Sequence, residues 1–369
     1  MQNYMQRIVD LSPTQETPVL LMDRSAIQSR AMDFINHANG SGVFYAVKAN
    51  PDPQIVRIID DTGMGFEISA TGELDLLLGI GIDAGKIITS NPIKAPDFVE
   101  KMYRFGVRRF VFDSVTEAEK IARWAPGSDV MVRLTVENLE SSWPLTDKFG
   151  IEPKQAAKLL IQSRDLGLNP VGITFHVGSQ CEGTSSWHAA LDRAANVWHY
   201  VAQDGLNLEI LNIGGGFPAY HGVDVPSIET IYGIVFKRVA ELFPPNLVLE
   251  AEPGRSLVAD AGTLVASVLG KAERKQENWL YLDIGVFNGL MEAVGEIPYQ
   301  FTPLANHGDD YMKWTIAGPS CDSFDVIATD ISLPELAIGD KLLITPGGAY
   351  TTAYASSFNG VPIPSVVVV

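Results

Sequence analysis

Cysteine is scarce in this chain, where Cys181 and Cys321 are the only two among 369 residues. Two cysteines cannot form the disulfide framework of a small secreted protein. Neither has the spaced partners of a zinc site. We therefore expect no disulfide scaffold and no bound metal.

Basic residues are also few, with 27 Lys and Arg against 44 Asp and Glu, which gives a formal net charge of -17. Proteins that bind nucleic acids neutralise phosphates with clustered Lys and Arg. This sequence has no basic stripe of that kind. Nucleic acid is therefore not expected as a partner.

Long apolar runs are missing as well. No stretch approaches the roughly 20 apolar residues of a membrane helix. The first 16 residues, MQNYMQRIVDLSPTQE, lack the apolar segment of a signal peptide. We therefore expect a cytoplasmic protein that does not enter a membrane, with a chain long enough for one large domain or two.

A repeated pattern fills the region between residues 43 and 255. A short β-rich apolar run, a turn and a stretch with helical spacing follow one another eight times. The runs begin at Val43, Gly65, Lys86, Val107, Val130, Val171, Leu208 and Leu247. Eight such units favour a (β/α)₈ barrel over an open, doubly wound sheet.

The two ends of the chain differ from this middle region. Residues 17–23 and the stretch from about residue 262 onward contain β-type runs broken by Gly, Pro and Asp, with little helical periodicity. We therefore predict an α/β protein with a TIM-like barrel over residues 24–259. A second, β-rich domain is expected from residues 1–23 and 260–369.

Polar and ionisable residues stand at the ends of the predicted barrel strands, where the active sites of such barrels lie. Their positions predict an enzyme. They are Lys48, Glu67, Asn91, Asp113, Arg133, His176, Ser179, Gly214, Gly215, Gly216, Glu252 and Arg255.

Three consecutive glycines, Gly214 to Gly216, follow one of these strands. Their backbone N–H groups can surround an anion, and Ser179 and Arg255 can add a hydroxyl and a charge. The sequence patterns of ATP and NAD sites are absent. A phosphate-bearing carbonyl cofactor opposite Lys48 suggests a Schiff base with pyridoxal phosphate.

Six motifs in chain order resemble one family, the fold-type III (alanine-racemase-fold) pyridoxal-phosphate decarboxylases. Within that family the chain is most similar to ornithine and lysine decarboxylases, in their bacterial form. The motifs are YAVKAN at Lys48, HVGSQ at His176, GGGFP at Gly214, EPGR at Glu252, CDSFD at Cys321 and GAYT at Gly348. The resemblance covers nearly the whole chain.

The resemblance implies a role for each matched residue in the barrel. Lys48 would form the Schiff base, His176 would stack on the pyridine ring, and Glu252 would pair with the pyridine nitrogen. Glu67 and Arg133 are expected to complete the cofactor site. The phosphate would be held by Ser179, Gly214, Gly215, Gly216, Arg255 and Tyr350.

Glu252 bears on the type of reaction. A carboxylate beside the pyridine nitrogen keeps that nitrogen protonated, so the ring can accept the electron pair released as CO₂ leaves. Alanine racemases place an arginine there. Glu252 therefore favours decarboxylation over racemisation, although a racemase remains an alternative.

The CDSFD motif implies a homodimer with shared active sites. In the family this segment enters the neighbouring subunit's site, where Cys321 would direct a proton to Cα and Asp322 would bind the substrate's distal ammonium. Across the same interface the family pairs the lysine of KFG with the second aspartate of the motif. Here these residues are Lys148 and Asp325.

Asp322 fits a substrate that ends in a cation, so we predict decarboxylation of L-ornithine to putrescine in polyamine biosynthesis. Lysine, giving cadaverine, is the first alternative, followed by diaminobutyrate, arginine and diaminopimelate. Asp283 is a further substrate-binding candidate. It lies one residue before the position that the eukaryotic enzymes use, which is Ile284 here.

A non-catalytic regulatory homologue is the alternative from another class, but such proteins lose cofactor residues and none is lost here. The histidines outside the motifs are expected to be structural or at the surface. They are His37, His188, His199, His221 and His307.

Overall fold

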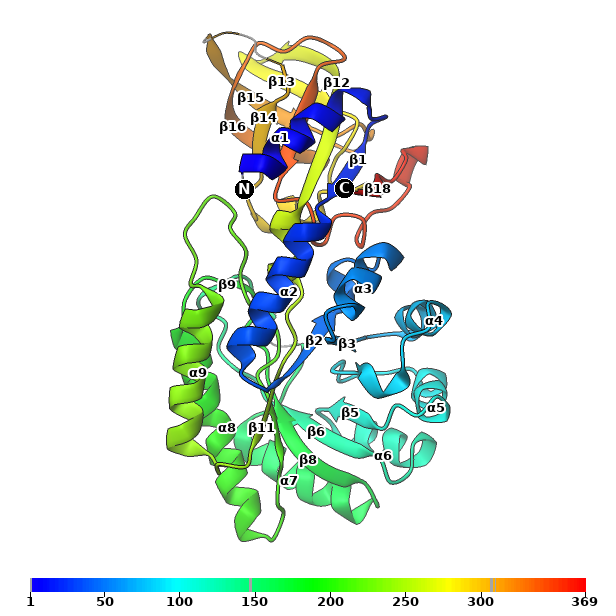
Figure 1. Ribbon diagram of the computed structural model, residues 1–369, viewed down its shortest axis with the longest axis vertical. Coiled ribbons are helices and arrows are strands. Elements are labelled where there is room, and N and C mark those ends of the chain that lie inside the picture. Colours follow the sequence, from blue (N-terminus) through cyan, green and yellow to red (C-terminus); the bar gives the residue numbers. More distant parts are fainter. Residues whose placement is uncertain (1, 146–147, 306–307, 309) are drawn as a thin grey trace. The chain divides into compact units, whose positions relative to one another are not determined.

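The computed structural model describes residues 2–145, 148–305, 308 and 310–369 (Figure 1). His307 lies outside these residues. The chain divides into two compact units, here called the barrel unit and the sheet unit. The barrel unit contains Gln28–Pro218 and Val225–Gly254, and the sheet unit contains Met1–Ile27, Ala219–Asp224 and Arg255–Val369.

The barrel unit is built around eight parallel strands that pair in chain order. They are β2 (Gly42–Ala46), β3 (Gly65–Glu67), β4 (Ile87–Ile88), β5 (Arg109–Phe112), β6 (Asp129–Arg133), β8 (Asn169–Thr174), β10 (Ile210–Asn212) and β11 (Val248–Ala251). The last strand pairs with the first. A parallel bridge between Thr89 and Phe110 connects the end of β4 to β5 and closes the circle. The predicted (β/α)₈ barrel is confirmed.

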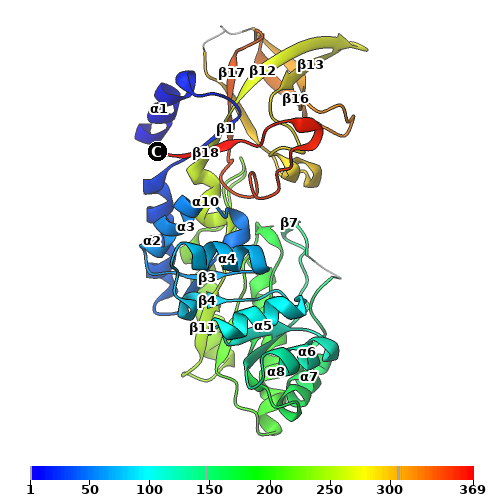
Figure 2. The same cartoon turned by 90° about the vertical axis from the view of Figure 1, so that its right-hand side faces the viewer.

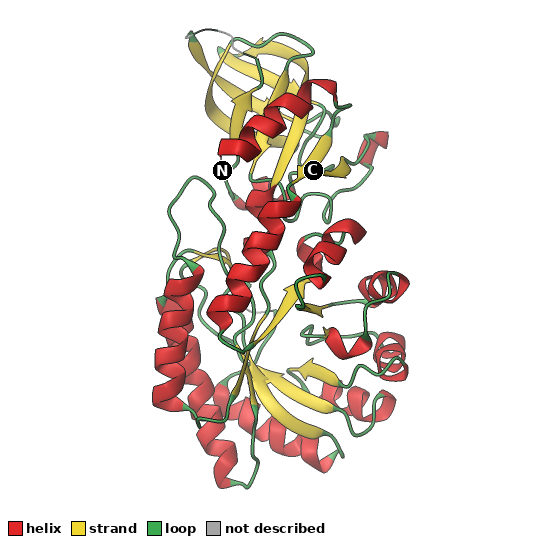
Figure 3. Cartoon of the chain, in the orientation of Figure 1, coloured by secondary structure: helices red, strands yellow, loops and turns green. Residues whose placement is uncertain are grey.

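Helices connect these strands and lie around them (Figure 3). They are α2 (Arg24–Ala38), α3 (Pro53–Asp60), α4 (Thr71–Gly79), α5 (Pro96–Arg104), α6 (Val115–Trp124), α7 (Pro153–Asp165), α8 (Ser185–Gln203) and α9 (Ile228–Leu242). Three of them, α3, α6 and α9, begin with a side-chain cap, because Asp52, Ser114 and Ser227 each accept a hydrogen bond from a backbone N–H of the following helix. In Figure 2, α3 to α6 follow one another along one side of the barrel unit.

Two short strands, β7 (Ser141–Trp143) and β9 (Ser179–Cys181), form a separate antiparallel pair within the barrel unit. An apolar cluster of Val111, Met131, Val171 and Ile210 spans four neighbouring barrel strands. Burial of such side chains is the main favourable contribution to folding. The strand ends are thereby held in fixed positions.

The sheet unit has one eight-stranded sheet, built from both ends of the chain. Its strands are β1 (Val19–Met22), β12 (Gly262–Arg274), β13 (Glu277–Leu282), β14 (Gln300–Pro303), β15 (Tyr311–Ala317), β16 (Val326–Pro334), β17 (Lys341–Thr345) and β18 (Ser365–Val368). β1 pairs antiparallel with β12 and parallel with β18. This confirms the predicted β-rich second domain from both chain ends.

The described part of this unit also contains the α-helices α1 (Gln2–Leu11) and α10 (Arg255–Val258). Ile8 of α1 packs into a buried cluster with Val19, Leu21, Val265 and Leu343. The two units divide near Ile27 and Gly254, whereas the domain limits expected from the sequence, at residues 24 and 259, stay a prediction. Among the described residues, no helix is both long enough and apolar enough to span a bilayer.

Candidate active site

Lys48 lies directly after β2, and its amine faces the last residue of β3. The distance from Lys48 Nζ to Glu67 Oε2 is 3.1 Å. The Glu67 side chain is 1% exposed, whereas that of Lys48 is 45% exposed. A buried carboxylate therefore holds one side of an amine that solvent and ligands can reach.

Glu252 follows β11 and is the second buried carboxylate at this end of the barrel. Ser90 Oγ and Asn212 Nδ2 both donate to its Oε1, the latter at 2.7 Å. Burial, followed by repulsion from Glu67, raises the pKa of Glu252 to about 7, and the two hydrogen bonds and Lys48 act in the opposite direction. The carboxyl group can therefore change its charge near neutral pH.

Asn212 extends this hydrogen-bonded network toward the other end of the strands. Its Nδ2 lies 3.4 Å from Glu250 Oε2, and Glu250 forms a 2.8 Å ion pair with Arg109. Asn212 Oδ1 accepts from the backbone N–H of Gly214 at 2.8 Å. One amide thus connects Glu252, Glu250 and the glycine loop.

His176 is neutral, because burial and the nearby positive charges of Arg133 and Lys48 hold its pKa well below the usual value. Its Nδ1 accepts a hydrogen bond from the backbone N–H of Gly178 at 3.0 Å. A neutral imidazole that accepts at Nδ1 carries its proton on Nε2. The ring therefore presents an uncharged face and one N–H.

Arg133 ends β6, and its guanidinium lies over the Phe149 ring, with 5.5 Å between Cζ and the ring centroid. Burial lowers its pKa, and the negative charges of Glu252, Asp113 and Glu67 act against this. The arginine therefore contributes a positive charge that these three carboxylates share.

The glycine loop, Gly214 to Gly216, follows β10 and has no room for side chains. A Cβ on Gly214 would lie 2.0 Å from the Phe175 carbonyl oxygen, and one on Gly216 would lie 2.4 Å from that of Gly178. Both glycines have positive φ, +67° and +99°. Only glycine meets both conditions. The loop packs directly against the segment that carries His176 and Ser179, where the Cys181 N–H donates to the Gly216 carbonyl at 2.9 Å.

In the sheet unit, Arg255 is buried and forms a bidentate ion pair with Glu292. Its Nη1 lies 2.7 Å from Glu292 Oε2 and 3.5 Å from His221 Nε2. The Tyr350 ring centroid lies 4.9 Å from its Cζ. The guanidinium is therefore fixed on several sides by residues of its own unit.

The CDSFD segment presents Cys321 and Asp322 at the surface of the single chain. Asp322 Oδ1 accepts the Phe324 N–H at 2.9 Å, and the Cys321 N–H donates to Asn359 Oδ1 at 2.9 Å. Lys148, in the barrel unit, is also exposed, with its Nζ 5.0 Å from the Phe149 ring centroid.

Asp325, by contrast, is only 3% exposed and binds its own chain. Its carboxylate accepts the backbone N–H groups of Val286 at 2.7 Å and Ser320 at 3.0 Å. It therefore shapes the loop that carries Cys321 and Asp322. The interface pairing with Lys148 stays a prediction.

Asp283 contacts neighbouring residues of the sheet unit through both carboxylate oxygens. Thr17 Oγ1 donates to one at 2.5 Å, and the Ser267 N–H donates to the other at 2.9 Å. These bonds connect the segment before β1, strand β12 and the end of β13. They favour a structural role, and its role in substrate binding stays a prediction.

Sequence reasoning missed Ser90, Asn212, Glu292 and His221 as site neighbours. Asn212 directly precedes the IGGG run, and Ser90 directly precedes Asn91, which was selected as a strand end. Their positions next to these motifs were the only signals in the sequence that could have identified Asn212 and Ser90. His221 was expected to be structural or at the surface, and it is buried beside Arg255.

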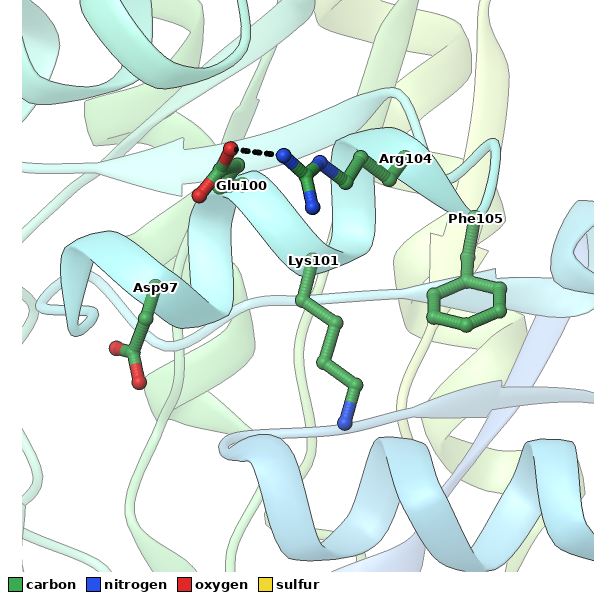
Figure 4. A pocket seen from close by; sticks show the side chains of 5 residues that line it. All are labelled: Asp97, Glu100, Lys101, Arg104 and Phe105. Carbon is green, nitrogen blue, oxygen red and sulfur yellow. Dashed lines mark ion pairs between the residues drawn. The ribbon is translucent and has the colours of Figure 1, made fainter.

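A surface hollow on α5 lies elsewhere in the barrel unit (Figure 4). Glu100 and Arg104 form an ion pair of 2.8 Å there, and Lys101 pairs with Asp75 of α4. Its remaining lining residues are Asp97 and Phe105. None of the predicted site residues lines this hollow.

Comparison with known proteins gives the following similarities. A family model described as the pyridoxal-binding domain of pyridoxal-dependent decarboxylases matches residues 24–259. The chain is 37% identical over 350 residues to a lysine/ornithine decarboxylase of Selenomonas ruminantium, which covers 93% of this chain and 87% of that protein. It is 32% identical over 334 residues to antizyme inhibitor 2 of Xenopus laevis, at 86% and 73% coverage.

Among solved structures, the chain resembles a lysine/ornithine decarboxylase from Vibrio vulnificus complexed with cadaverine. The TM-score is 0.92 at 30% sequence identity, over 100% of this chain and 99% of that one. The likeness therefore includes both units.

Proposed function

The chain belongs to the pyridoxal-dependent decarboxylase family, and on that basis we propose that it removes CO₂ from ornithine or lysine with pyridoxal phosphate as its cofactor. The observation that carries the proposal is the pair of buried carboxylates around Lys48. Glu67 holds the amine at 3.1 Å, and the buried Glu252 would keep a ring nitrogen protonated. An amine and a proton-holding carboxylate are the two groups that this chemistry requires.

The residues present fit this cofactor. The glycine loop packs so tightly that a Cβ on Gly214 would lie 2.0 Å from the Phe175 carbonyl oxygen, so its backbone is held in one conformation. Because the Gly214 N–H already donates to Asn212, the N–H groups of Gly215 and Gly216 would be the ones offered to a phosphate, beside Ser179. Arg255 and Tyr350 of the sheet unit are the other proposed phosphate ligands. When bound, pyridoxal phosphate supplies an electron sink for the pair left on Cα as CO₂ departs.

The side chains of the barrel unit have distinct proposed tasks. Lys48 would bind the cofactor's aldehyde carbon through its amine, and Glu252 would keep the pyridine nitrogen protonated. His176 would lie against the ring face. Because His176 is neutral, it adds no positive charge that would repel the proton on the pyridine nitrogen. Arg133 and Glu67 would balance the charge around these groups.

Asp322 is the proposed ligand of the substrate's distal ammonium. Because a carboxylate favours a substrate whose side chain ends in a cation, ornithine and lysine are the leading substrates. We favour ornithine, giving putrescine. The test is kcat/KM for purified protein with ornithine, lysine, arginine, diaminobutyrate and diaminopimelate, because specificity is the ratio of these values. Release of CO₂ from none of them would refute the proposal. An Asp322→Glu enzyme with unchanged ornithine activity would exclude Asp322 as the ligand.

A homodimer with shared sites is the proposed assembly. The exposure of Cys321 and Asp322 in the single chain supports it. Residues that act in a partner's active site must be accessible at the surface of their own chain. Mixing Lys48→Ala chains with Asp322→Asn chains tests it. Random pairing would restore about one quarter of the activity, because half the dimers would carry one intact site of two. No recovery after verified subunit exchange would contradict shared sites.

The antizyme inhibitor among the relatives makes a non-catalytic regulator the second candidate. Lys48, Glu252 and the glycine loop are all retained, which favours an enzyme. Binding of pyridoxal phosphate, detected as a visible absorbance band that is lost in Lys48→Ala, distinguishes the two. Chiral analysis of incubated substrate tests the racemase alternative. The cytoplasmic location stays a prediction.

A further inference from the structure

Ser90 lies between the two buried carboxylates of the site and donates to both. Its backbone N–H lies 3.3 Å from Glu67 Oε1, and its hydroxyl donates to Glu252 Oε1. The residue follows β4 and is only 8% exposed. Glu67 and Glu252 are themselves 1% and 6% exposed. Ser90 therefore donates one hydrogen bond to each of two buried carboxylates, from its N–H to Glu67 and from its hydroxyl to Glu252.

The direction of these bonds determines which oxygen of Glu252 remains available. Ser90 and Asn212 both donate to Oε1. In the part of the chain that the structure describes, Oε2 receives no hydrogen bond. A carboxylate held through one oxygen presents the other in a fixed direction. Oε2 is therefore the oxygen of Glu252 that is left to accept from a further donor.

We propose that Ser90 is a positioning residue that fixes Glu252 through Oε1 and keeps it ionised, so that Oε2 can hold the proton on the cofactor's ring nitrogen. This rests on the proposed function and assigns it a further residue. Hydrogen bonds to charged groups are worth roughly one to two decades in an equilibrium constant. Loss of the hydroxyl therefore has a measurable effect.

The charges around Glu252 set the direction of that effect. Lys48 and Arg133 favour its ionised form, and Glu67 opposes it. With these groups unchanged, removal of a donor shifts the balance toward the protonated acid. A protonated Glu252 carries no negative charge with which to stabilise the protonated ring nitrogen.

Ser90→Ala is the cleaner test, because Asn212 also holds the glycine loop through the Gly214 N–H. We expect about a tenfold or greater fall in kcat with little change in KM for the amino acid, and an acid limb of the kcat profile that moves to higher pH. The full chain freed of cofactor should also bind pyridoxal phosphate about tenfold more weakly. Ser90→Thr, which keeps the hydroxyl, should recover most of both losses.

The matched control is Ser163→Ala, which deletes a buried hydroxyl that donates to the Leu160 carbonyl at 2.8 Å, within α7. It should leave kcat, the pH profile and cofactor affinity as in the wild type. Circular dichroism and Tm verify that each variant folds. If folded Ser90→Ala matches the control, or if folded Ser90→Thr is as impaired as Ser90→Ala, the inference is wrong. If the wild type binds no pyridoxal phosphate, the proposed function itself fails.

Discussion

The ion pair of Arg255 and Glu292 predicts a large loss of stability when one partner is removed. The two side chains are 3% and 4% exposed, and the guanidinium faces the carboxylate through both terminal nitrogens. Breaking a buried pair leaves a charge without its counter-ion and costs about 3–5 kcal/mol. Glu292→Leu removes the carboxylate that faces the Arg255 guanidinium, whereas the 3.5 Å contact with His221 and the face of the Tyr350 ring carry no full negative charge to replace it.

Glu292→Leu should therefore lower the free energy of unfolding by about 3–5 kcal/mol. For a unit of this size that corresponds to a fall in Tm of roughly 10 °C. Adding Arg255→Met removes the stranded charge, so the double variant should be more stable than Glu292→Leu alone. Scanning calorimetry in the absence of pyridoxal phosphate measures both effects without a contribution from cofactor binding.

A surface pair of the same sheet unit provides the control. Lys271 and Glu335 lie 2.7 Å apart, but they are 36% and 69% exposed. Glu335→Leu should change the free energy of unfolding far less than Glu292→Leu does, because solvent screens an exposed ion pair. The reasoning is refuted if Glu292→Leu is as mild as this control, or if the double variant is no more stable than the single one.

Three further predictions concern the site and its surroundings. Glu252→Gln should lower kcat about 100-fold while the protein still binds pyridoxal phosphate, and a variant with wild-type CO₂ release would argue against its role. Gly214→Ala should lower the free energy of unfolding by more than about 2 kcal/mol in urea titration because of the 2.0 Å clash, whereas Gly233→Ala on α9, which meets nothing within 4 Å, should not destabilise the protein. Burial, followed by repulsion from Arg255, lowers the pKa of His221 to about 4, so the unfolded chain binds a proton between about pH 6.5 and 4 that the folded chain does not. Stability should therefore fall by about 3 kcal/mol over that range from this group alone, and His221→Asn should show a smaller pH dependence than the wild type in urea titrations at pH 7 and 4.5.

The barrel could be predicted because its evidence is local. Each strand run is followed by a turn and a stretch with helical spacing, and the stretches that become α5 and α6 begin with clear helix signals, a proline at Pro96 and a capping serine at Ser114. For the sheet unit, the sequence predicts β-strands but does not predict the order in which they pair in the sheet. Its parallel pairings, β13 with β15 and β1 with β18, join strands that are distant in the chain. Short-range patterns contain no information about such partners.

In the candidate active site, too, some residues could be predicted from the sequence and others could not. Lys48, Glu67 and Glu252 could be found because ionisable residues at strand ends stand out against apolar runs. Ser90 and Asn212 could not, because a serine and an asparagine at a turn are ordinary in sequence. Their function depends on closure of the barrel, which brings β4, β10 and β11 together. Glu292 was missed for a related reason, since its partner Arg255 lies 37 residues earlier in the chain.

The pairing of β1 with β18 also orders events during synthesis. All eight barrel strands have been made once residue 251 leaves the ribosome, so the barrel unit can assemble while the chain is still growing. The sheet unit needs residues 19–22 from the start of the chain and residues 365–368 from its end. Domains generally fold as units during translation. One edge of β1 therefore stays unpaired until residues 365–368 have been made.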